Sequence, residues 1–268
     1  MRLRAYGLTD KGRIRPTNED CFAIREDLGL CVIADGMGGH NAGEVAARLA
    51  VDAVVDYVEE HHARCADAGV SGEPVEHRAD LWPFGFDPSL SADGNLLRHA
   101  VHVADLQVRE TAVSSQDCAG MGTTIVAVRV AAGRLSVAHA GDSRLYLLAG
   151  RALRQVTQDD SWMAEMLADD PDADPSLFAN HPMRNALTNV VGAKSRTEVH
   201  VVEQTLAGGE LLLLSTDGVH GVLDGPRIEQ MVLEEDEPRA IAHAIVSSAL
   251  TRGSRDNCTA VVARYTRG

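Results

Sequence analysis

Acidic residues recur in five short motifs along the chain, each beside glycine, serine, threonine or asparagine. In chain order the motifs are Arg15-Pro16-Thr17-Asn18-Glu19-Asp20, Asp35-Gly36-Met37-Gly38-Gly39-His40, Gly141-Asp142-Ser143-Arg144, Ser215-Thr216-Asp217-Gly218 and Arg255-Asp256-Asn257. An Asp-Gly step after a strand is ordinary turn chemistry, so any single motif is explained more readily as a turn than as a ligand. Their joint occurrence has another explanation, because acids at the ends of several strands converge if those strands share a sheet.

Carboxylates crowded at one point repel one another and cannot all remain ionised. Divalent cations resolve this conflict, and ligation by oxygen alone favours Mg²⁺ or Mn²⁺ over zinc. Two such ions, roughly 3.5–4 Å apart, acidify a shared water for attack on phosphorus and neutralise charge on the transferring phosphoryl group. Arginine is the natural second phosphate ligand, since its fork contacts two phosphate oxygens at once. The motifs therefore predict two-metal phosphoryl chemistry.

Short apolar runs that end at these motifs predict the strands that must position them. Residues 30–34 lead into Asp35, residues 135–140 lead into Asp142, and residues 211–216 lead into Asp217. Further strands are predicted at residues 123–130, 145–149, 199–203 and 259–265.

Amphipathic helices are predicted between the strands. Their apolar faces are Ala46, Leu49, Ala50, Ala53, Val54 and Tyr57 in one, Leu97, Ala100, Val101, Ala104 and Val108 in the next, and Ile241, Ala244, Ile245 and Ala249 near the C-terminus. Asn41 and Glu44 form a capping box at the first helix, and Pro238 and Gly253 mark the ends of the last. Two helices, then mostly strands, then two closing helices do not alternate as βαβ units do. The pattern predicts an α+β fold in which helices cover largely antiparallel sheets.

Two segments interrupt this pattern. Residues 66–94, rich in Gly, Pro, Asp and Ser, are predicted to be an inserted surface loop. Residues 158–189 are predicted to be a mobile flap with little regular structure. Trp82 and Trp162 lie in these segments and are expected to be ordinary loop residues. With no internal repeat, residues 1–268 are predicted to form one catalytic domain.

Composition narrows the class of protein. The formal net charge of −14 argues against a nucleic-acid partner, since phosphate backbones are bound by surplus Lys and Arg. The 45% of apolar residues suffices for a real core. Five cysteines without a C-x-x-C pair are typical of a reduced chain, so a cytoplasmic location is expected. The sequence has no secretion signal and no run apolar enough to cross a membrane.

The motifs taken in this order, together with Met-Gly-Thr-Thr at 121–124, resemble the protein phosphatase 2C family and most of all its bacterial branch. The resemblance extends from about residue 6 to residue 265 and implies a metal-dependent serine/threonine protein phosphatase. It also implies a four-layer α-β-β-α sandwich of two antiparallel sheets flanked by helices.

The same resemblance implies roles for the residues of two main metal sites. Asp35 would bridge both ions. Glu19 and the carbonyl of Gly36 would complete the second site, and Asp217 and Asp256 would hold the first ion. These ions would be Mn²⁺ or Mg²⁺.

Other roles follow from the resemblance for positions around the two main ions. Asp20 would bind through water, and Asp142 would hold a third, weaker ion together with Asp217. Arg15 would bind the substrate phosphate. Residues 121–124 would lie in the sheet beneath the site as structural support.

The sequence departs from the family at three places. Met37 follows the Asp-Gly step where the animal enzymes have a histidine that acts on the leaving group, so water held by the metals would take over that role. His40 would either substitute or steady its loop by a hydrogen bond. Asp160 stands where the flap usually has histidine. His139, on a strand, is expected to be an ordinary half-buried histidine.

The expected partners are phosphorylated proteins and a membrane-linked serine/threonine kinase whose action the enzyme reverses. Two alternatives from the same family are a catalytically inactive phosphoprotein-binding relative and a phosphatase of anti-sigma antagonist proteins. An inactive relative should have lost a metal ligand, whereas this chain keeps all four of Glu19, Asp35, Asp217 and Asp256.

Overall fold

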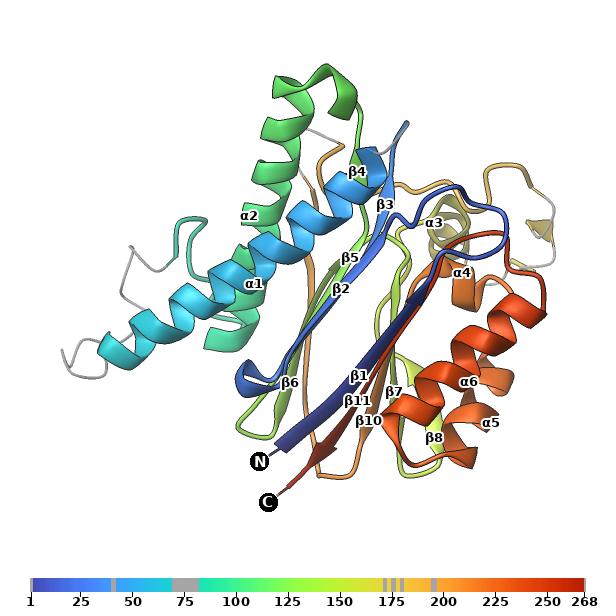
Figure 1. The fold of residues 1–268 in the computed structure, drawn as a ribbon. Helices are drawn as coiled ribbons and strands as arrows, with labels where there is room; N and C mark the ends of the chain where they lie inside the picture. Colours follow the sequence, from blue (N-terminus) through green and yellow to red (C-terminus); the bar gives the residue numbers. More distant parts are fainter. Residues whose placement is uncertain are drawn as a thin grey trace.

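The computed structural model describes residues 2–39, 42–68, 82–170, 173–174, 177–178, 181–193 and 197–267. In that part of the chain, two antiparallel sheets pack face to face and helices cover both outer faces (Figure 1). The predicted α+β class and the four-layer α-β-β-α sandwich are confirmed.

One sheet joins the two ends of the chain. Its strands, in spatial order, are β1 (Arg2–Asp10), β11 (Cys258–Thr266), β10 (Leu211–Ser215), β7 (Arg144–Ala149) and β8 (Ala152–Gln155). β1 and β11 pair along their whole lengths, so the two termini lie side by side (Figure 1). β1 therefore pairs with a strand from the opposite end of the sequence, and the residues of β1 by themselves do not indicate this partner.

The second sheet carries the first two acidic motifs. Its strands, in spatial order, are β2 (Asp20–Arg25), β3 (Leu30–Met37), β5 (Ile125–Ala131), β6 (Arg134–Ala140) and β9 (His200–Thr205), and the short β4 (Gly122–Thr123) pairs with the end of β3. The predicted support role of residues 121–124 agrees with this position, because β4 lies against Gly36 and Met37.

The helices form the two outer layers. Their bounds are α1 (Ala42–Ala68), α2 (Ala92–Ser114), α3 (Trp162–Asp169), α4 (Asp217–His220), α5 (Gly225–Glu234) and α6 (Pro238–Thr251), with short 3₁₀ turns at Glu26–Leu28 and Gln116–Cys118. α1 and α2 pack on the β3 sheet, and α5 and α6 pack on the β11 sheet (Figure 1). A third apolar cluster fills the space between the sheets.

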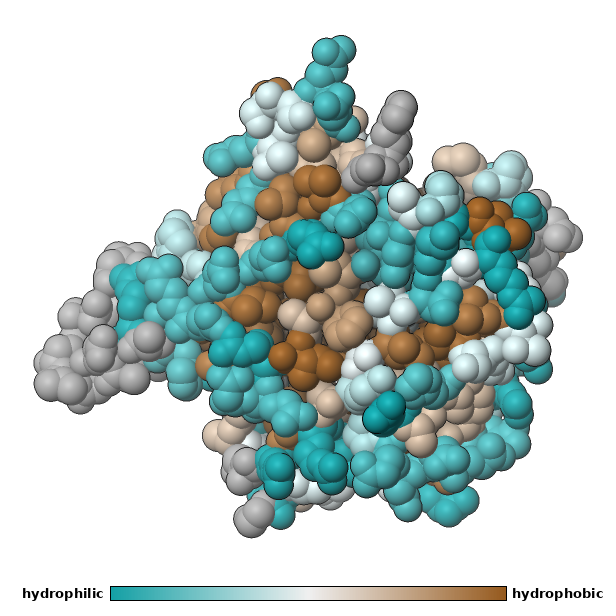
Figure 2. Space-filling model, viewed as in Figure 1, coloured by the Kyte–Doolittle hydropathy of each residue, from teal (hydrophilic) through white to brown (hydrophobic). Residues whose placement is uncertain are grey.

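The spacing of apolar residues in α1 explains which face of the helix is buried. Ala46, Ala50 and Val54 are fully buried on its inner face. The charged side chains of Arg48 and Asp52 lie on its outer face, which Figure 2 shows as a hydrophilic band along the helix. This division between an apolar and a charged face is what the sequence predicts.

Two predictions about irregular segments need correction. α1 continues to Ala68 and α2 begins at Ala92, so the connection is shorter than residues 66–94; residues 69–81 lie outside the described residues. Trp82 is no ordinary loop residue, because it is 4% exposed and its ring lies 4.8 Å from that of His61. It therefore closes the core beneath α1 and α2.

The flap also has more structure than its sequence predicts. α3 lies within residues 158–189, with the Ser161 hydroxyl accepting a hydrogen bond from the Ala164 amide as its N-terminal cap. Trp162 stacks on His181 at 4.2 Å between ring centroids. Local capping and an aromatic stack thus stabilise a segment whose prolines and aspartates suggest a coil.

Candidate metal centre

One cavity at the end of the two sheets, the metal cavity, collects nearly all the predicted site residues. It encloses about 400 Å³ and is lined by Arg15, Glu19, Asp35, Gly36, Met37, Gly38, Thr124, Asp142, Asn185, Ala186, Leu187, Asp217 and Asp256. These residues come from segments far apart in the sequence, including the end of the flap. The structure therefore brings together the acids whose convergence the motifs predict.

Strand register explains this convergence. Asp20 on β2 is the direct partner of Asp35 on β3. In the other sheet, Ser215 at the end of β10 pairs with Arg144 on β7 and with Ala260 on β11. The ends of β3 and β10 and the beginnings of β2, β7 and β11 consequently lie at one end of the sandwich, and the acids adjoin those ends.

Main-chain and hydroxyl contacts hold the Asp35 segment in place. The Asp35 amide donates to the Thr124 hydroxyl at 3.0 Å, and its carbonyl accepts from the Thr123 hydroxyl at 2.9 Å. The Thr124 hydroxyl is also 2.7 Å from that of Ser143, beside Asp142. One buried pair of hydroxyls therefore links the two acidic turns.

Glycine at position 36 is a steric requirement. A Cβ there would lie 2.0 Å from the Gly43 carbonyl oxygen and 2.8 Å from the Glu19 carbonyl oxygen. The close approach brings the first turn of α1 and the Glu19 loop against the Gly36 backbone. This packing holds Gly36 beside Glu19, and both residues line the cavity.

Asn257 is a positioning residue that the sequence reasoning missed. Its side-chain oxygen accepts a hydrogen bond from the Glu19 amide at 2.8 Å, and its side-chain nitrogen donates to the carbonyls of Lys11 and Thr17. It thereby ties the loop that carries Arg15 and Glu19 to the strand that follows Asp256. The Asp-Asn pair in the last motif was the signal that could have identified it.

Asp20 lies beside the cavity and not in its lining. It is 8% exposed, and its Oδ2 accepts hydrogen bonds from the hydroxyls of Thr216 at 2.9 Å and Thr259 at 2.6 Å. Its buried Oδ1 has no hydrogen-bond partner among the described residues. Burial raises its pKa to about 7, and the charges of Asp217 and Asp256 add to this effect.

The carboxylates that line the cavity are hard to ionise together. Burial raises the pKa of Asp35 well above its ordinary value, and the nearby acids raise it further. Burial, followed by the charge of Asp217, raises the pKa of Asp142 to about 7. For Asp217 the pKa rises to about 6, through burial and then the charge of Asp256. A bound cation would remove the repulsive contribution to each shift.

The donor set fits divalent cations that prefer oxygen ligands. The cavity offers five carboxylates and a backbone carbonyl, and no histidine or cysteine is among its described lining residues. Asp217 also has a buried Oδ1 with no hydrogen-bond partner in the described part of the chain. Among the described residues, no three His, Cys, Asp or Glu side chains are arranged as ligands of one ion.

Arginine and methionine complete the site. Arg15 is ion-paired with Asp256 at 2.5 Å, at the mouth of the cavity. Met37 is 40% exposed and has no titratable proton to give a leaving group. His40 lies outside the described residues, so its predicted alternatives stay predictions.

Comparison with known proteins gives consistent matches. A sequence profile described as Protein phosphatase 2C matches residues 16–251. The serine/threonine phosphatase stp of Listeria monocytogenes is 30% identical over 263 residues, which cover 97% of this chain and 95% of that protein. The serine/threonine protein phosphatase PstP of Mycobacterium tuberculosis is 32% identical over 269 residues, which cover 97% of this chain and 45% of PstP.

Solved structures agree with the sequence matches. The crystal structure of the Mycobacterium tuberculosis phosphatase PstP/Ppp has a TM-score of 0.80 at 29% identity, with complete coverage of both chains. The catalytic domain of PstP in complex with two manganese ions has a TM-score of 0.78 at 29% identity over 99% of each chain. On the profile match, the relatives and the shared fold, the chain belongs to the protein phosphatase 2C family of metal-dependent phosphatases.

Proposed function

We propose that this chain hydrolyses phosphoserine and phosphothreonine in proteins, with Mn²⁺ or Mg²⁺ in the metal cavity. One observation carries the proposal: acids from all five motifs, together with Arg15, line a single cavity. Relatives named serine/threonine phosphatases, one of them solved with two manganese ions, support the choice of substrate and metal.

In this proposal the lining residues divide between two main ions. Asp35 would be a ligand of both ions, and Asp217 and Asp256 would hold the first. Glu19 and the Gly36 carbonyl complete the second site.

Two further acids have weaker metal roles in the proposal. Asp142, with Asp217, holds a third ion. The recessed position of Asp20 supports a role through water, because Asp20 lies beside the cavity and not in its lining.

The bound ions supply a water acidified for attack on phosphorus and neutralise phosphoryl charge. The chain's own residues bind and orient the substrate. Arg15 is paired with Asp256, and a phosphate that enters the cavity offers its guanidinium a second anionic partner. Since Met37 cannot donate a proton, the serine or threonine oxygen that leaves takes its proton from water.

The same proposal covers the domain organisation of the enzyme, the kinase that it opposes and its location. Residues 1–268 act as one catalytic domain, with the flap as its substrate-side wall. The enzyme reverses the action of a serine/threonine kinase on shared substrates. It works in the cytoplasm, because the described cysteines Cys21, Cys31, Cys118 and Cys258 are free thiols, as in reducing compartments. No described helix has the length and apolar character to cross a membrane.

Hydrolysis of an aryl phosphate tests the proposed function directly. The purified protein should turn over p-nitrophenyl phosphate with Mn²⁺ and lose that activity when EDTA is added. A phosphothreonine peptide should be hydrolysed under the same conditions. Absence of turnover with every divalent ion tried would overturn the proposal.

A further inference from the structure

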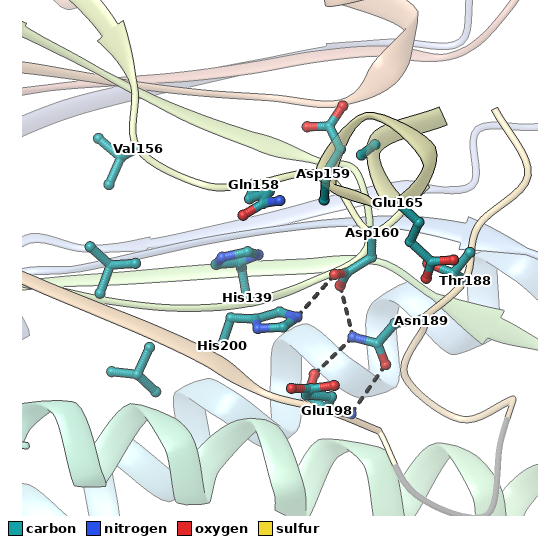
Figure 3. Close-up of a pocket in the computed structure, with 14 residues that line it drawn as sticks. His139, Val156, Gln158, Asp159, Asp160, Glu165, Thr188, Asn189, Glu198 and His200 are labelled. Carbon is teal, nitrogen blue, oxygen red and sulfur yellow. Dashed lines mark hydrogen bonds and ion pairs between the residues drawn. The ribbon is translucent and has the colours of Figure 1, made fainter. Parts of the chain in front are cut away.

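A second cavity, the flap cavity, lies directly behind the end of the flap. It encloses about 690 Å³, within the range of ligand pockets, and its polar lining includes His139, Asp159, Asp160, Glu165, Glu198 and His200 (Figure 3). The two cavities share one short segment. Ala186 and Leu187 line the metal cavity, whereas Thr188 and Asn189 line the flap cavity. The two cavities are therefore neighbours. A phosphoprotein bound at the metal cavity can reach the flap cavity with residues close in sequence to its phosphorylated residue.

Two of the acids in the flap cavity are already compensated. Asp159 is ion-paired with Arg144 at 2.6 Å. Asp160 contacts His200 at 2.9 Å and accepts hydrogen bonds from Asn189 at 2.7 Å and from the Gly141 amide at 2.8 Å. Asp160 thus anchors both ends of the flap to the turn that carries Asp142, and it needs no ligand of its own.

The other two acids are not compensated. The carboxylates of Glu165 and Glu198 have no hydrogen-bond or ion-pair partner among the described residues. The Glu198 contacts with Asn189 involve only the main-chain groups of Glu198. Both glutamates are exposed, so the opening of the cavity carries two negative charges available to a ligand.

A buried histidine lies deeper in the same cavity. His139 is 2% exposed, and its Nδ1 has no partner among the described residues. The prediction of an ordinary half-buried histidine is therefore wrong. His139 pairs across the strands with His200, and their ring centroids are 5.1 Å apart (Figure 3). Burial lowers the pKa of His139 to about 4, so its ring is neutral at neutral pH and adds no positive charge to the cavity.

The charges and rings that line the flap cavity define the chemistry of a ligand that would fit it. Two exposed carboxylates above a pair of histidine rings favour a cation that has hydrogen-bond donors and a flat face. A single metal ion fits poorly, because Glu165 on α3 and Glu198 before β9 are both exposed at the opening, whereas His139 is buried. A guanidinium fits better, since it has five donors and a planar face that stacks on aromatic rings such as the histidine pair.

We propose that the flap cavity binds an arginine side chain of the phosphoprotein substrate, close in sequence to the phosphorylated residue. Glu165 and Glu198 attract the guanidinium, and His139 and His200 form its floor. This inference rests on the proposed function, because it assigns a second recognition point to the same substrate. It makes the enzyme selective for phosphosites with arginine at one fixed offset.

A peptide scan tests this inference. A phosphothreonine peptide with alanine flanks is compared with a set in which arginine replaces one alanine at a time. Arginine at one or two adjacent offsets should raise kcat/KM, mainly through a lower KM. Glu198→Gln and Glu165→Gln should each reduce that gain by about two- to fivefold, the range of an exposed ion pair. Glu198→Lys should instead favour the peptide with glutamate at the same offset.

Matched measurements separate the possible outcomes. Glu110→Gln, on the exposed surface of α2 away from both cavities, should preserve the arginine preference. Hydrolysis of p-nitrophenyl phosphate reports on the metal cavity alone, since it carries no basic group. If it and the alanine peptide are hydrolysed but arginine gives no gain at any offset, or a gain that the glutamate variants do not reduce, the flap-cavity inference is wrong. If neither is hydrolysed, the proposed function fails, and this inference fails with it.

Discussion

At the residue scale, the metal cavity combines several acids that repel one another with one cationic side chain, the guanidinium of Arg15. Arg15 is paired with Asp256, which has its own proposed role as a metal ligand. In the proposed function, a divalent ion bound to Asp256 would weaken the attraction of Arg15 to that carboxylate and leave its guanidinium available to phosphate. The ion pair would then couple metal binding to substrate binding through a single carboxylate.

Asp35→Asn tests the bridging role. Asparagine keeps the shape but removes the negative charge that both ions would share, so turnover of an aryl phosphate with Mn²⁺ should fall by about a hundredfold or more. Circular dichroism and thermal unfolding should show that the variant remains folded. A rate near that of the unmodified enzyme would contradict the assignment.

Arg15→Ala tests the phosphate contact. Hydrogen bonds to charged groups contribute about 1.5–3 kcal/mol, so KM should rise by about 10- to 100-fold. Because substrate and transition state share this contact, kcat should change little. Arg13→Ala is the matched control, two residues away, exposed and outside the lining of the metal cavity. An unchanged KM in Arg15→Ala would count against the role.

At the element scale, the position of the acids depends on tight contacts between turns. Asp217 is the first residue of α4, and α4 lies against the segment that carries Asp256 and Asn257. A Cβ on Gly218 would lie 1.8 Å from the Asn257 carbonyl oxygen. Glycine at 218 thus lets the turn after β10 and the approach to β11 meet.

Gly218→Ala should break that contact. The added methyl must displace backbone, which should lower the free energy of unfolding by about 1–3 kcal/mol and the Tm by about 2–10 °C. Gly225→Ala, at the first position of α5, is the control, because a Cβ there meets nothing within 4 Å. Urea and thermal unfolding of both variants measure the difference. Equal stabilities would show that the turn yields easily.

At the scale of the whole molecule, a net charge of −14 is concentrated in part at one end of the sandwich. Buried carboxylates there oppose folding whenever they are ionised without a counterion. Cations that bind only the folded protein should therefore stabilise it by mass action.

The stabilisation by Mn²⁺ should depend on pH. The pKa of Asp20 and of Asp142 is raised from 3.8 to about 7 in the folded protein, chiefly by burial. Between these values the folded protein holds protons that the unfolded chain has released, so the stability of the metal-free protein falls as pH rises. Metal ions replace those protons, so the stabilisation by metal grows over the same range.

Paired unfolding experiments measure this effect. Tm is recorded with Mn²⁺ and with EDTA at each pH, and the difference should increase by about 5 °C or more from pH 5 to pH 8. Taking the difference cancels the contribution of histidines remote from the metals to the pH dependence of Tm. His99 is one of these, and burial lowers its pKa to about 4. A difference in Tm that does not vary with pH would contradict the prediction.

Much of the fold was predictable because the spacing of apolar residues along the sequence indicates strands and helix faces. The strand that leads into Asp35 and the helix face that includes Ala46 and Val54 lie where the pattern predicts them. Three strands were missed: β1, β2 and β8. β1 contains Arg2, Arg4 and a central glycine, which weaken its strand pattern, and its pairing with β11 forms it as an edge strand.

The sequence by itself determined which residues are present for chemistry: acids at strand ends, an arginine, and oxygen ligands suited to hard cations. Spacing and residue type suffice for this, because ligand chemistry is a property of side chains. The tertiary structure was needed to show that Asp20 is recessed, that Asn257 fastens the Glu19 loop, and that His139 lies buried against His200 in a second cavity. These features depend on contacts between residues as far apart as 19 and 257, and no local pattern encodes such distances.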